Sequence, residues 1–333
     1  MLRLPPFEYL RPSTVVEAIR MRSDAGPAGQ FVAGGTDLYP NMKRRQETPT
    51  TVIDIADLPE LRGVSPGPSG GLRLGAGLRL SEIESQKDLL AGYPAVTHGA
   101  STISTPILRN MGTLGGNLLL DTRCNYYDQT FEWRRAIDFC MKRDGEICWV
   151  APGSPRCWAV QSSDLAPVMV AMGAEVTLVG PEGERTIPAS ALYVDDGMKF
   201  TSKRPEELLT SVTLPPPRNA QAVYRKVRRR GSFDFPVLGT AVWARLAGGN
   251  GEGPVAEEIR VVLGAVGSHP LRATAAEDLL RGHPLTEERI RAAAVAAARP
   301  AKPMDNTDLT LGWRKEMVKV EVARALREIL PRR

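Results

Sequence analysis

Short apolar runs alternate with stretches of helical periodicity along the N-terminal half of the chain, a pattern typical of mixed α and β domains. The apolar runs predict strands at residues 7–10, 31–33, 52–55 and 72–74, and a Gly/Pro/Ser-rich segment predicts a turn at 65–71. A helix is expected to begin at Ser13 or Thr14, because Thr14 and Glu17 have capping-box spacing and Val15 and Ile19 are apolar. Further helices are expected at residues 38–44 and 93–101.

The C-terminal half repeats this mixture with a different order of elements. A helix is expected at residues 163–172, followed by strands at 174–179 and 209–214. Three consecutive prolines at 215–217 form a stiff connector, so we place a domain boundary there. Beyond it, alternating patterns predict strands at residues 223–227, 237–245 and 259–266, and helical spacing predicts helices at 273–280, 287–298 and 311–329.

Composition narrows the class of protein. The 333 residues are 42% hydrophobic and 24% charged, as in an ordinary globular protein of two or three domains. The net charge is +5, and lysines and arginines are interleaved with acids except at residues 226–230, so nucleic-acid binding is not expected. An apolar run of about 18 residues, the length needed to span a membrane, does not occur. With no signal peptide evident, we expect a cytoplasmic protein.

Two glycine-rich loops carry the first candidate chemistry. Gly34, Gly35, Thr36 and Asp37 stand between an expected strand and an expected helix, where backbone N–H groups can approach a phosphate. A second loop, at residues 109–117, contains three glycines with polar neighbours. Together the loops suggest one large anionic ligand held from two sides, although two tight turns explain the same residues equally well.

The four cysteines of the chain form the second candidate site. They are Cys124, Cys140, Cys148 and Cys157, at spacings of 16, 8 and 9 residues. Two disulfides, a zinc site or an iron–sulfur cluster could each use them. The absence of a C-x-x-C pair weakens the zinc interpretation, and a reducing cytosol disfavours disulfides. The three histidines are too scattered for a metal site, and no catalytic acid, base or nucleophile is expected.

The glycine loops, taken with later motifs, resemble the FAD-binding subunits of the xanthine dehydrogenase family of molybdenum hydroxylases. The shared motifs continue through residues 162–167, 205–209 and 224–226, in the same order over nearly the whole chain. The resemblance implies an α+β protein with a PCMH-type FAD-binding fold. Its expected parts are two α/β subdomains at 1–60 and 61–215, an inserted iron–sulfur loop at 122–161, and a C-terminal α+β domain at 216–333, similar to that of CO dehydrogenase flavoproteins.

The same resemblance implies which residues contact FAD. Residues 32–39 would surround the pyrophosphate and residues 113–117 a second phosphate and the ribityl chain. Asp164 would bind ribityl or ribose hydroxyls, Leu209 and Ile103 would lie at the flavin, and Lys226 at its polar edge. The implied cofactor-binding residues are Val32, Ala33, Gly34, Gly35, Thr36, Asp37, Leu38, Tyr39, Ile103, Thr113, Leu114, Gly115, Gly116, Asn117, Asp164, Leu209 and Lys226.

The cysteine-bearing insertion resembles that of the flavin subunits of 4-hydroxybenzoyl-CoA reductases, in which four cysteines hold an additional [4Fe-4S] cluster. Cys124, Cys140, Cys148 and Cys157 are therefore the implied metal ligands. Aromatic residues of the loop are expected to cover the cluster. The basic residues Arg134, Arg135, Lys142, Arg143 and Arg156 are expected to form a solvated or docking surface, and some of them could offset the negative charge of the cluster. FAD is expected to remain when the cluster is lost, because its contacts lie outside residues 124–157.

The resemblance implies an electron-transfer subunit whose substrate site lies on another chain. Expected partners are a large subunit with the molybdenum cofactor, a small subunit with two [2Fe-2S] clusters, and a ferredoxin-like donor, in one or two heterotrimers. The implied reaction is reductive dehydroxylation of 4-hydroxybenzoyl-CoA to benzoyl-CoA. Two alternatives remain: a related flavin subunit serving another aromatic or N-heterocyclic substrate, and a FAD-free subunit whose cysteine loop binds zinc.

Overall fold

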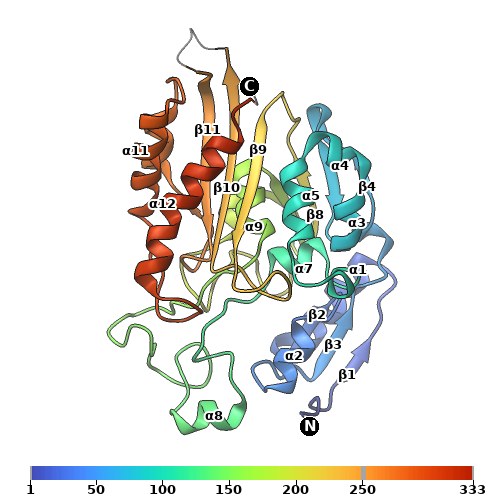
Figure 1. Ribbon diagram of the computed structural model, residues 1–333. Helices are drawn as coiled ribbons and strands as arrows, with labels where there is room; N and C mark the ends of the chain where they lie inside the picture. Colours follow the sequence, from blue (N-terminus) through green and yellow to red (C-terminus); the bar gives the residue numbers. More distant parts are fainter. Residues whose placement is uncertain (1, 249–252, 332–333) are drawn as a thin grey trace.

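The computed structural model describes residues 2–248 and 253–331, which form three sheets with helices packed between and around them (Figure 1). The sheet orders are β1-β3-β2, β4-β5-β8-β6-β7 and β12-β11-β10-β9. These sheets fall within the three sequence ranges expected for the two subdomains and the C-terminal domain. An α+β protein is thereby confirmed.

The N-terminal sheet is small and parallel. Its strands are β1 (Glu8–Leu10), β3 (Thr51–Asp54) and β2 (Gly29–Val32), and it is accompanied by α1 (Val15–Ala25) and α2 (Leu38–Lys43). Thr14 caps α1 as expected, accepting a hydrogen bond from the N–H of Glu17. The Glu17 carboxylate reaches Ser13 instead of Thr14, with 2.7 Å from its Oε2 to both the N and Oγ of Ser13. The start of the helix is thus fixed by local polar contacts.

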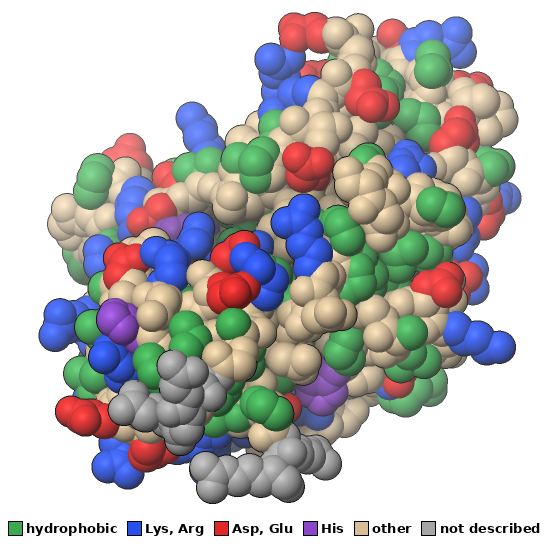
Figure 2. All heavy atoms as spheres, turned by 90° about the horizontal axis from the view of Figure 1, so that it is seen from above, with side chains coloured by type: hydrophobic (Ala, Val, Ile, Leu, Met, Phe, Trp, Pro, Cys, Tyr) green, Lys and Arg blue, Asp and Glu red, His purple; other side chains and the backbone are tan. Residues whose placement is uncertain are grey.

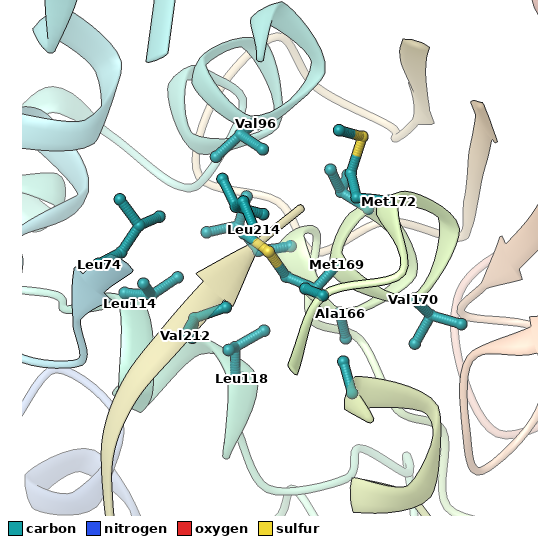
Figure 3. Close-up of a cluster of buried hydrophobic side chains, with 14 of the residues drawn as sticks. Leu74, Val96, Leu114, Leu118, Ala166, Met169, Val170, Met172, Val212 and Leu214 are labelled. Atoms are coloured by element: carbon teal, nitrogen blue, oxygen red, sulfur yellow. The ribbon is translucent and has the colours of Figure 1, made fainter. Parts of the chain in front are cut away.

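The middle sheet is antiparallel and supports most of the core. Its strands are β4 (Val64–Pro66), β5 (Leu72–Gly75), β6 (Glu175–Gly180), β7 (Gly183–Pro188) and β8 (Leu208–Leu214). The helices around it are α3 (Leu80–Ser85), α4 (Lys87–Gly92), α5 (Pro94–Ser101), α6 (Pro106–Arg109), α7 (Leu114–Leu118) and α9 (Leu165–Met172). Every residue of α9 is buried, which explains why its sequence is apolar all round. Figure 3 shows Ala166 and Met169 of this helix facing side chains of β5, α5, α7 and β8.

The C-terminal sheet is antiparallel and covered on both faces. It contains β9 (Gln221–Val227), β10 (Leu238–Ala247), β11 (Val255–Gly264) and β12 (Leu271–Arg272), followed by α10 (Thr274–Leu280), α11 (Glu287–Ala298) and α12 (Leu311–Glu328). Ala241 and Trp243 of β10 belong to the core that contains α9, whereas Val242 and Ala244 belong to the core beneath α11 and α12. This alternation ties the C-terminal domain to the flanking helix α9 (Figure 1).

The inserted segment projects from the lower part of the molecule in Figure 1, close to α2. A two-way backbone bridge closes its base, with N···O distances of 2.8 and 2.7 Å between Arg123 and Val160. Within the segment the described regular elements are α8 (Phe131–Ala136) and isolated bridges at Cys140. Its structure therefore depends on turns and side-chain contacts more than on regular secondary structure.

Most expected elements are confirmed to within one or two residues. The exceptions are short, and a segment shorter than two helical turns carries no clear periodicity. Helices α3, α4, α6, α7 and α8 and strands β7 and β12 were not expected, and β4 occupies part of the expected turn at 65–71. Strand β11 also begins at Val255 instead of residue 259. Among the described residues no helix is both long and apolar enough to cross a membrane.

The buried Arg314 offers a test of how α12 is attached. Its guanidinium donates to the carbonyls of Val237 at 3.0 Å, Met304 at 3.1 Å and Ala265. We expect Arg314→Met to lower the free energy of unfolding by at least about 3 kcal/mol, because buried carbonyls lose their donors. The apparent thermal midpoint, followed by circular dichroism, should fall by roughly 6 °C or more. The exposed neighbour Lys315→Met is the matched control and should leave the midpoint unchanged; equal midpoints for both variants would contradict this role.

Candidate functional site: a flavin cavity beside a four-cysteine loop

A cavity of about 650 Å³ lies where the N-terminal subdomain, the middle sheet and the base of the inserted segment meet. Its walls come from the β2–α2 loop, the loop before α7, and residues after β7. The structure brings together in its lining thirteen of the expected cofactor-binding residues: Val32, Ala33, Gly34, Gly35, Thr36, Asp37, Leu38, Ile103, Thr113, Gly115, Gly116, Asn117 and Leu209. A cavity of this size suits an extended organic cofactor.

The two glycine loops touch each other through their backbones. A Cβ atom built on Gly34 would lie 1.9 Å from the carbonyl oxygen of Met111, which no real side chain could occupy. Gly35 has a φ of 66°, and a Cβ there would lie 2.4 Å from the ring of Tyr39. Both positions therefore require glycine, one for close approach and the other also for its left-handed backbone.

The first loop presents a row of free backbone donors. Among the described residues, no backbone or side-chain acceptor is found for the N–H groups of Gly34, Gly35, Thr36, Asp37 and Leu38. Successive N–H groups of this kind form a concave site for an anion, and the start of α2 adds positive potential. The β2–α2 loop is thus suited to hold phosphate.

The second loop is built differently, because its own donors are already used. The N–H of Gly115 bonds the carbonyl of Ala76 at 2.8 Å, and the N–H of Gly116 bonds the Thr113 hydroxyl at 3.1 Å. Asn117 Oδ1 accepts from Ser163 Oγ at 2.7 Å and from the N–H of Leu165 at 3.2 Å. The Nδ2 of Asn117 has no acceptor among the described residues, so it is the polar group that this loop offers to the cavity.

Charged side chains line the cavity at positions that the sequence motifs did not mark. They are Arg22, Glu47, Asp121 and Lys203; Glu207, which lies in the shared motif at 205–209, also lines the cavity. Burial lowers the pKa of Lys203 to about 8. No local sequence signal distinguishes these residues, because they come from separate elements that only the fold brings together.

Comparison with known proteins identifies the family. The model for the FAD binding domain in molybdopterin dehydrogenase matches residues 5–217, and the model for the CO dehydrogenase flavoprotein C-terminal domain matches residues 222–329. The chain belongs to the FAD-binding subunits of the molybdopterin dehydrogenases. The large cavity, which we propose below as the site of FAD, is called the flavin cavity from here on.

Individual relatives support this assignment over most of the chain. The aldehyde oxidoreductase FAD-binding subunit PaoB of Escherichia coli K12 is 34% identical over 81% of this chain and 85% of its own length. The carbon monoxide dehydrogenase medium chain of Hydrogenophaga pseudoflava is 28% identical over 97% of this chain and 96% of its own. A solved structure of carbon monoxide dehydrogenase from that organism superposes with a TM-score of 0.80, at 28% identity, over 98% of each chain.

Four of the expected cofactor-binding residues lie outside the flavin cavity lining. The Tyr39 ring stacks on Phe7, and Leu114 is fully buried in the main core. Asp164 and Lys226 form a buried ion pair at 2.9 Å, and Asp164 also accepts from the Tyr224 hydroxyl at 2.7 Å. Burial raises the pKa of Asp164 and lowers that of Lys226, while their mutual attraction opposes both shifts. The pair joins α9 to β9 behind the cavity.

The four cysteines converge on a second, smaller cavity. All four thiols are free and buried, and all four line one space together with Tyr126, Tyr127, Met141, Lys142, Trp149 and Val150. The remaining free space is about 10 Å³, roughly enough for one water. Burial raises the pKa of Cys124 to about 12, so metal binding there would release a proton.

The ligand chemistry of this second cavity fits an iron–sulfur cluster in the number, type and burial of its thiols. Four thiolates around a single zinc lie about 3.8 Å apart, as Zn–S bonds of about 2.3 Å require. Among the described residues, no group of His, Cys, Asp and Glu is placed to hold a metal ion as it stands. A cluster would bind each thiolate at a separate iron. The narrow space means that the surrounding side chains must separate to admit it.

Two basic residues of the inserted segment were wrongly expected at its surface. Arg134 is fully buried, with its guanidinium donating to the carbonyls of Arg44 at 3.3 Å and Arg45 at 2.8 Å. Lys142 Nζ bonds Asp121 Oδ1 at 2.8 Å and Thr122 Oγ1 at 2.7 Å. Their long apolar stems fill space inside a loop that has few aliphatic residues. The Lys142 ammonium is fully hydrogen-bonded, whereas Nε and Nη1 of Arg134 have no hydrogen-bond partner among the described residues. On the face shown in Figure 2, acidic and basic side chains are interspersed over the described residues.

The two cavities share a wall. Lys142 lines the cysteine cavity and Asp121 lines the flavin cavity, and these residues form the ion pair just described. Tyr127 and Glu47 form a second such contact, with 3.5 Å between the phenol oxygen and the carboxylate. One layer of side chains therefore separates the two sites.

The backbone contact between the glycine loops can be tested at Gly34. We expect Gly34→Ala to weaken FAD binding at least tenfold (about 1.4 kcal/mol) and so to lower the flavin content of the purified protein, because the new Cβ must push the β2–α2 loop away from Met111. Flavin absorbance relative to protein in the purified complex is the measurement. Gly312→Ala, at an open position in α12, is the matched control and should keep full flavin. Full flavin in both variants would show that the loop contact does not shape the site.

Proposed function

We propose that this chain is an electron-transfer subunit with two redox groups, FAD in the flavin cavity and a [4Fe-4S] cluster held by Cys124, Cys140, Cys148 and Cys157. The observation that supports this most strongly is the shared wall: four buried thiols surround one space, and that space lies one layer of side chains from the flavin cavity.

Each part of the chain has a defined task in this proposal. The free N–H groups of the β2–α2 loop hold the FAD phosphates, and Asn117 Nδ2 orients a hydroxyl group. When bound, FAD supplies transfer of one or two electrons and the cluster supplies transfer of one. Tyr127 and Lys142 are almost fully buried and exclude water from the space between the sites. No residue of this chain needs to act as an acid, base or nucleophile.

The proposal includes partner chains. Relatives are named as medium chains or FAD-binding subunits, which makes them components of multi-chain enzymes. We infer a large partner with the molybdenum cofactor and the substrate site, a small partner with two [2Fe-2S] clusters, and a ferredoxin-like electron donor.

Two substrates are worth testing. The cysteine-bearing insertion resembles that of 4-hydroxybenzoyl-CoA reductases, which favours 4-hydroxybenzoyl-CoA as an electron acceptor at the partner's molybdenum. The 34% identity to an aldehyde oxidoreductase subunit favours oxidation of aldehydes as the second candidate. The two reactions run electrons in opposite directions through this chain.

Metal content tests the cysteine site directly. We expect about four irons per chain beyond those of the partners, and loss of these irons in Cys140→Ser, because each thiolate ligates one iron of the cluster. Iron analysis and electron paramagnetic resonance of the reduced protein are the measurements. Ile147→Ser places the same new side chain at an exposed position of the same loop and should keep the iron. One zinc per chain, or two disulfides, would overturn the cluster assignment and leave FAD binding intact.

Activity of the purified complex distinguishes the substrates. A 4-hydroxybenzoyl-CoA reductase should form benzoyl-CoA when supplied with a reduced low-potential donor, and should not oxidise simple aldehydes. An aldehyde oxidoreductase should reduce an artificial electron acceptor when given an aromatic aldehyde. Activity with the aldehyde alone would reject the reductase assignment while leaving the two-cofactor proposal standing.

A further inference from the structure

We infer that Arg123 is a positioning residue for the flavin: through Asp37 it fastens the phosphate-binding β2–α2 loop to the inserted segment, so that this segment helps to determine how tightly FAD is held. The inference rests on the proposed assignment of FAD phosphates to the β2–α2 loop. It adds to the sequence-based expectation that FAD remains when the cluster is lost, because Arg123 lies outside residues 124–157 but is part of the inserted segment.

Arg123 stands at the base of the inserted segment, directly before Cys124. Its backbone is fixed by the bridge to Val160, and the residue is 9% exposed. Its guanidinium forms an ion pair with Asp37, and a second one at 3.4 Å with Asp128. The planar guanidinium of Arg123 thereby bridges a carboxylate of the β2–α2 loop and a carboxylate of the inserted segment.

Asp37 is free to take this role because it does not cap its own helix. It occupies the N-cap position of α2 but makes no capping hydrogen bond. Its carboxylate instead accepts from Arg123 and, at 3.2 Å, from Asn41 Nδ2. The start of α2 and the free N–H groups before it are therefore held in part by Arg123 of the inserted segment.

The inserted segment also holds the chain beyond the other end of α2. Arg134 donates to the carbonyls of Arg44 and Arg45, and Gln46 Nε2 donates to the carbonyl of Tyr127 at 2.5 Å. Arg45 has a φ of 59°, a left-handed conformation that needs support in a residue other than glycine. Contacts at both ends thus hold the helix against the inserted segment.

An aromatic residue of the C-terminal domain that lines the flavin cavity also contacts the Arg123 guanidinium. The ring of Phe235, which lines the cavity from the β9–β10 connection, lies with its centroid 4.5 Å from Arg123 Cζ. One side chain therefore contacts the phosphate loop, the inserted segment and the C-terminal domain. A loop whose N–H groups are left free for a ligand has few bonds of its own, so it depends on such outside contacts for its shape.

The test compares FAD affinity in the full chain, purified with its partners, between Arg123→Gln and Arg135→Gln. Arg135 is an exposed arginine of the same segment that pairs only with Glu132 among the described residues. We expect the dissociation constant for FAD to rise about tenfold or more in Arg123→Gln, because a buried charge pair is broken, and to stay unchanged in Arg135→Gln. Arg123→Lys should show an intermediate dissociation constant, since an ammonium keeps the positive charge but cannot bond two carboxylates with the planar geometry of a guanidinium.

A double-mutant cycle with Asp37→Asn separates this role from a general loss of structure. If Arg123 acts through Asp37, the double variant should bind FAD no more weakly than the weaker single variant. Additive losses, or an unchanged dissociation constant in Arg123→Gln, would overturn the inference. Absence of FAD from the unmodified chain would instead reject the flavin assignment itself. Hydrogen exchange of residues 34–43 should rise in Arg123→Gln and remain unchanged in Arg135→Gln.

Discussion

The close approach of two backbones, Gly34 against the carbonyl of Met111, is the contact on which the flavin cavity depends. It brings the parallel N-terminal sheet against the loop before α7 and leaves no room for a side chain between them. The N–H groups of residues 34–38 beside this contact remain without internal acceptors among the described residues. Unpaired backbone donors are costly when buried, so a fold keeps them only where solvent or a ligand completes them.

The two glycine loops look equivalent in sequence but differ physically. The backbone N–H groups of the first loop are without acceptors among the described residues. In the second loop, backbone N–H groups donate to the carbonyls of Ala76 and Leu78, and the side-chain oxygen of Asn117 accepts hydrogen bonds at the start of α9. The second loop is therefore bonded to the main core, whereas the first loop is held by side-chain contacts with the inserted segment. Changes in the inserted segment can therefore alter the shape of the first loop, which we propose as the phosphate site.

The sequence predicted features that depend on neighbouring residues. The cap of α1 at Thr14, the helix expected at residues 163–172 and the alternation in β10 all rest on local signals, and each element appears where expected. What could not be predicted are contacts between distant positions. Arg123 and Asp37 are 86 residues apart, and nothing in either local sequence marks them as partners. The burial of Arg134 and Lys142 was missed for the same reason, since a basic residue in a polar loop ordinarily faces solvent.

The composition of the inserted segment explains why it must fold by other means than a core. Between Arg123 and Val160 the packed apolar side chains are mainly the cysteines themselves and a few aromatic residues. Buried arginine and lysine side chains, bonded to carbonyls and carboxylates of the flavin subdomain, hold the segment in place. Such contacts are directional and specific, but each contributes little net stability. Ligation of one metal centre by the four thiolates, as proposed above, would add a large local free energy to these contacts, and would order the part of the segment that they do not reach.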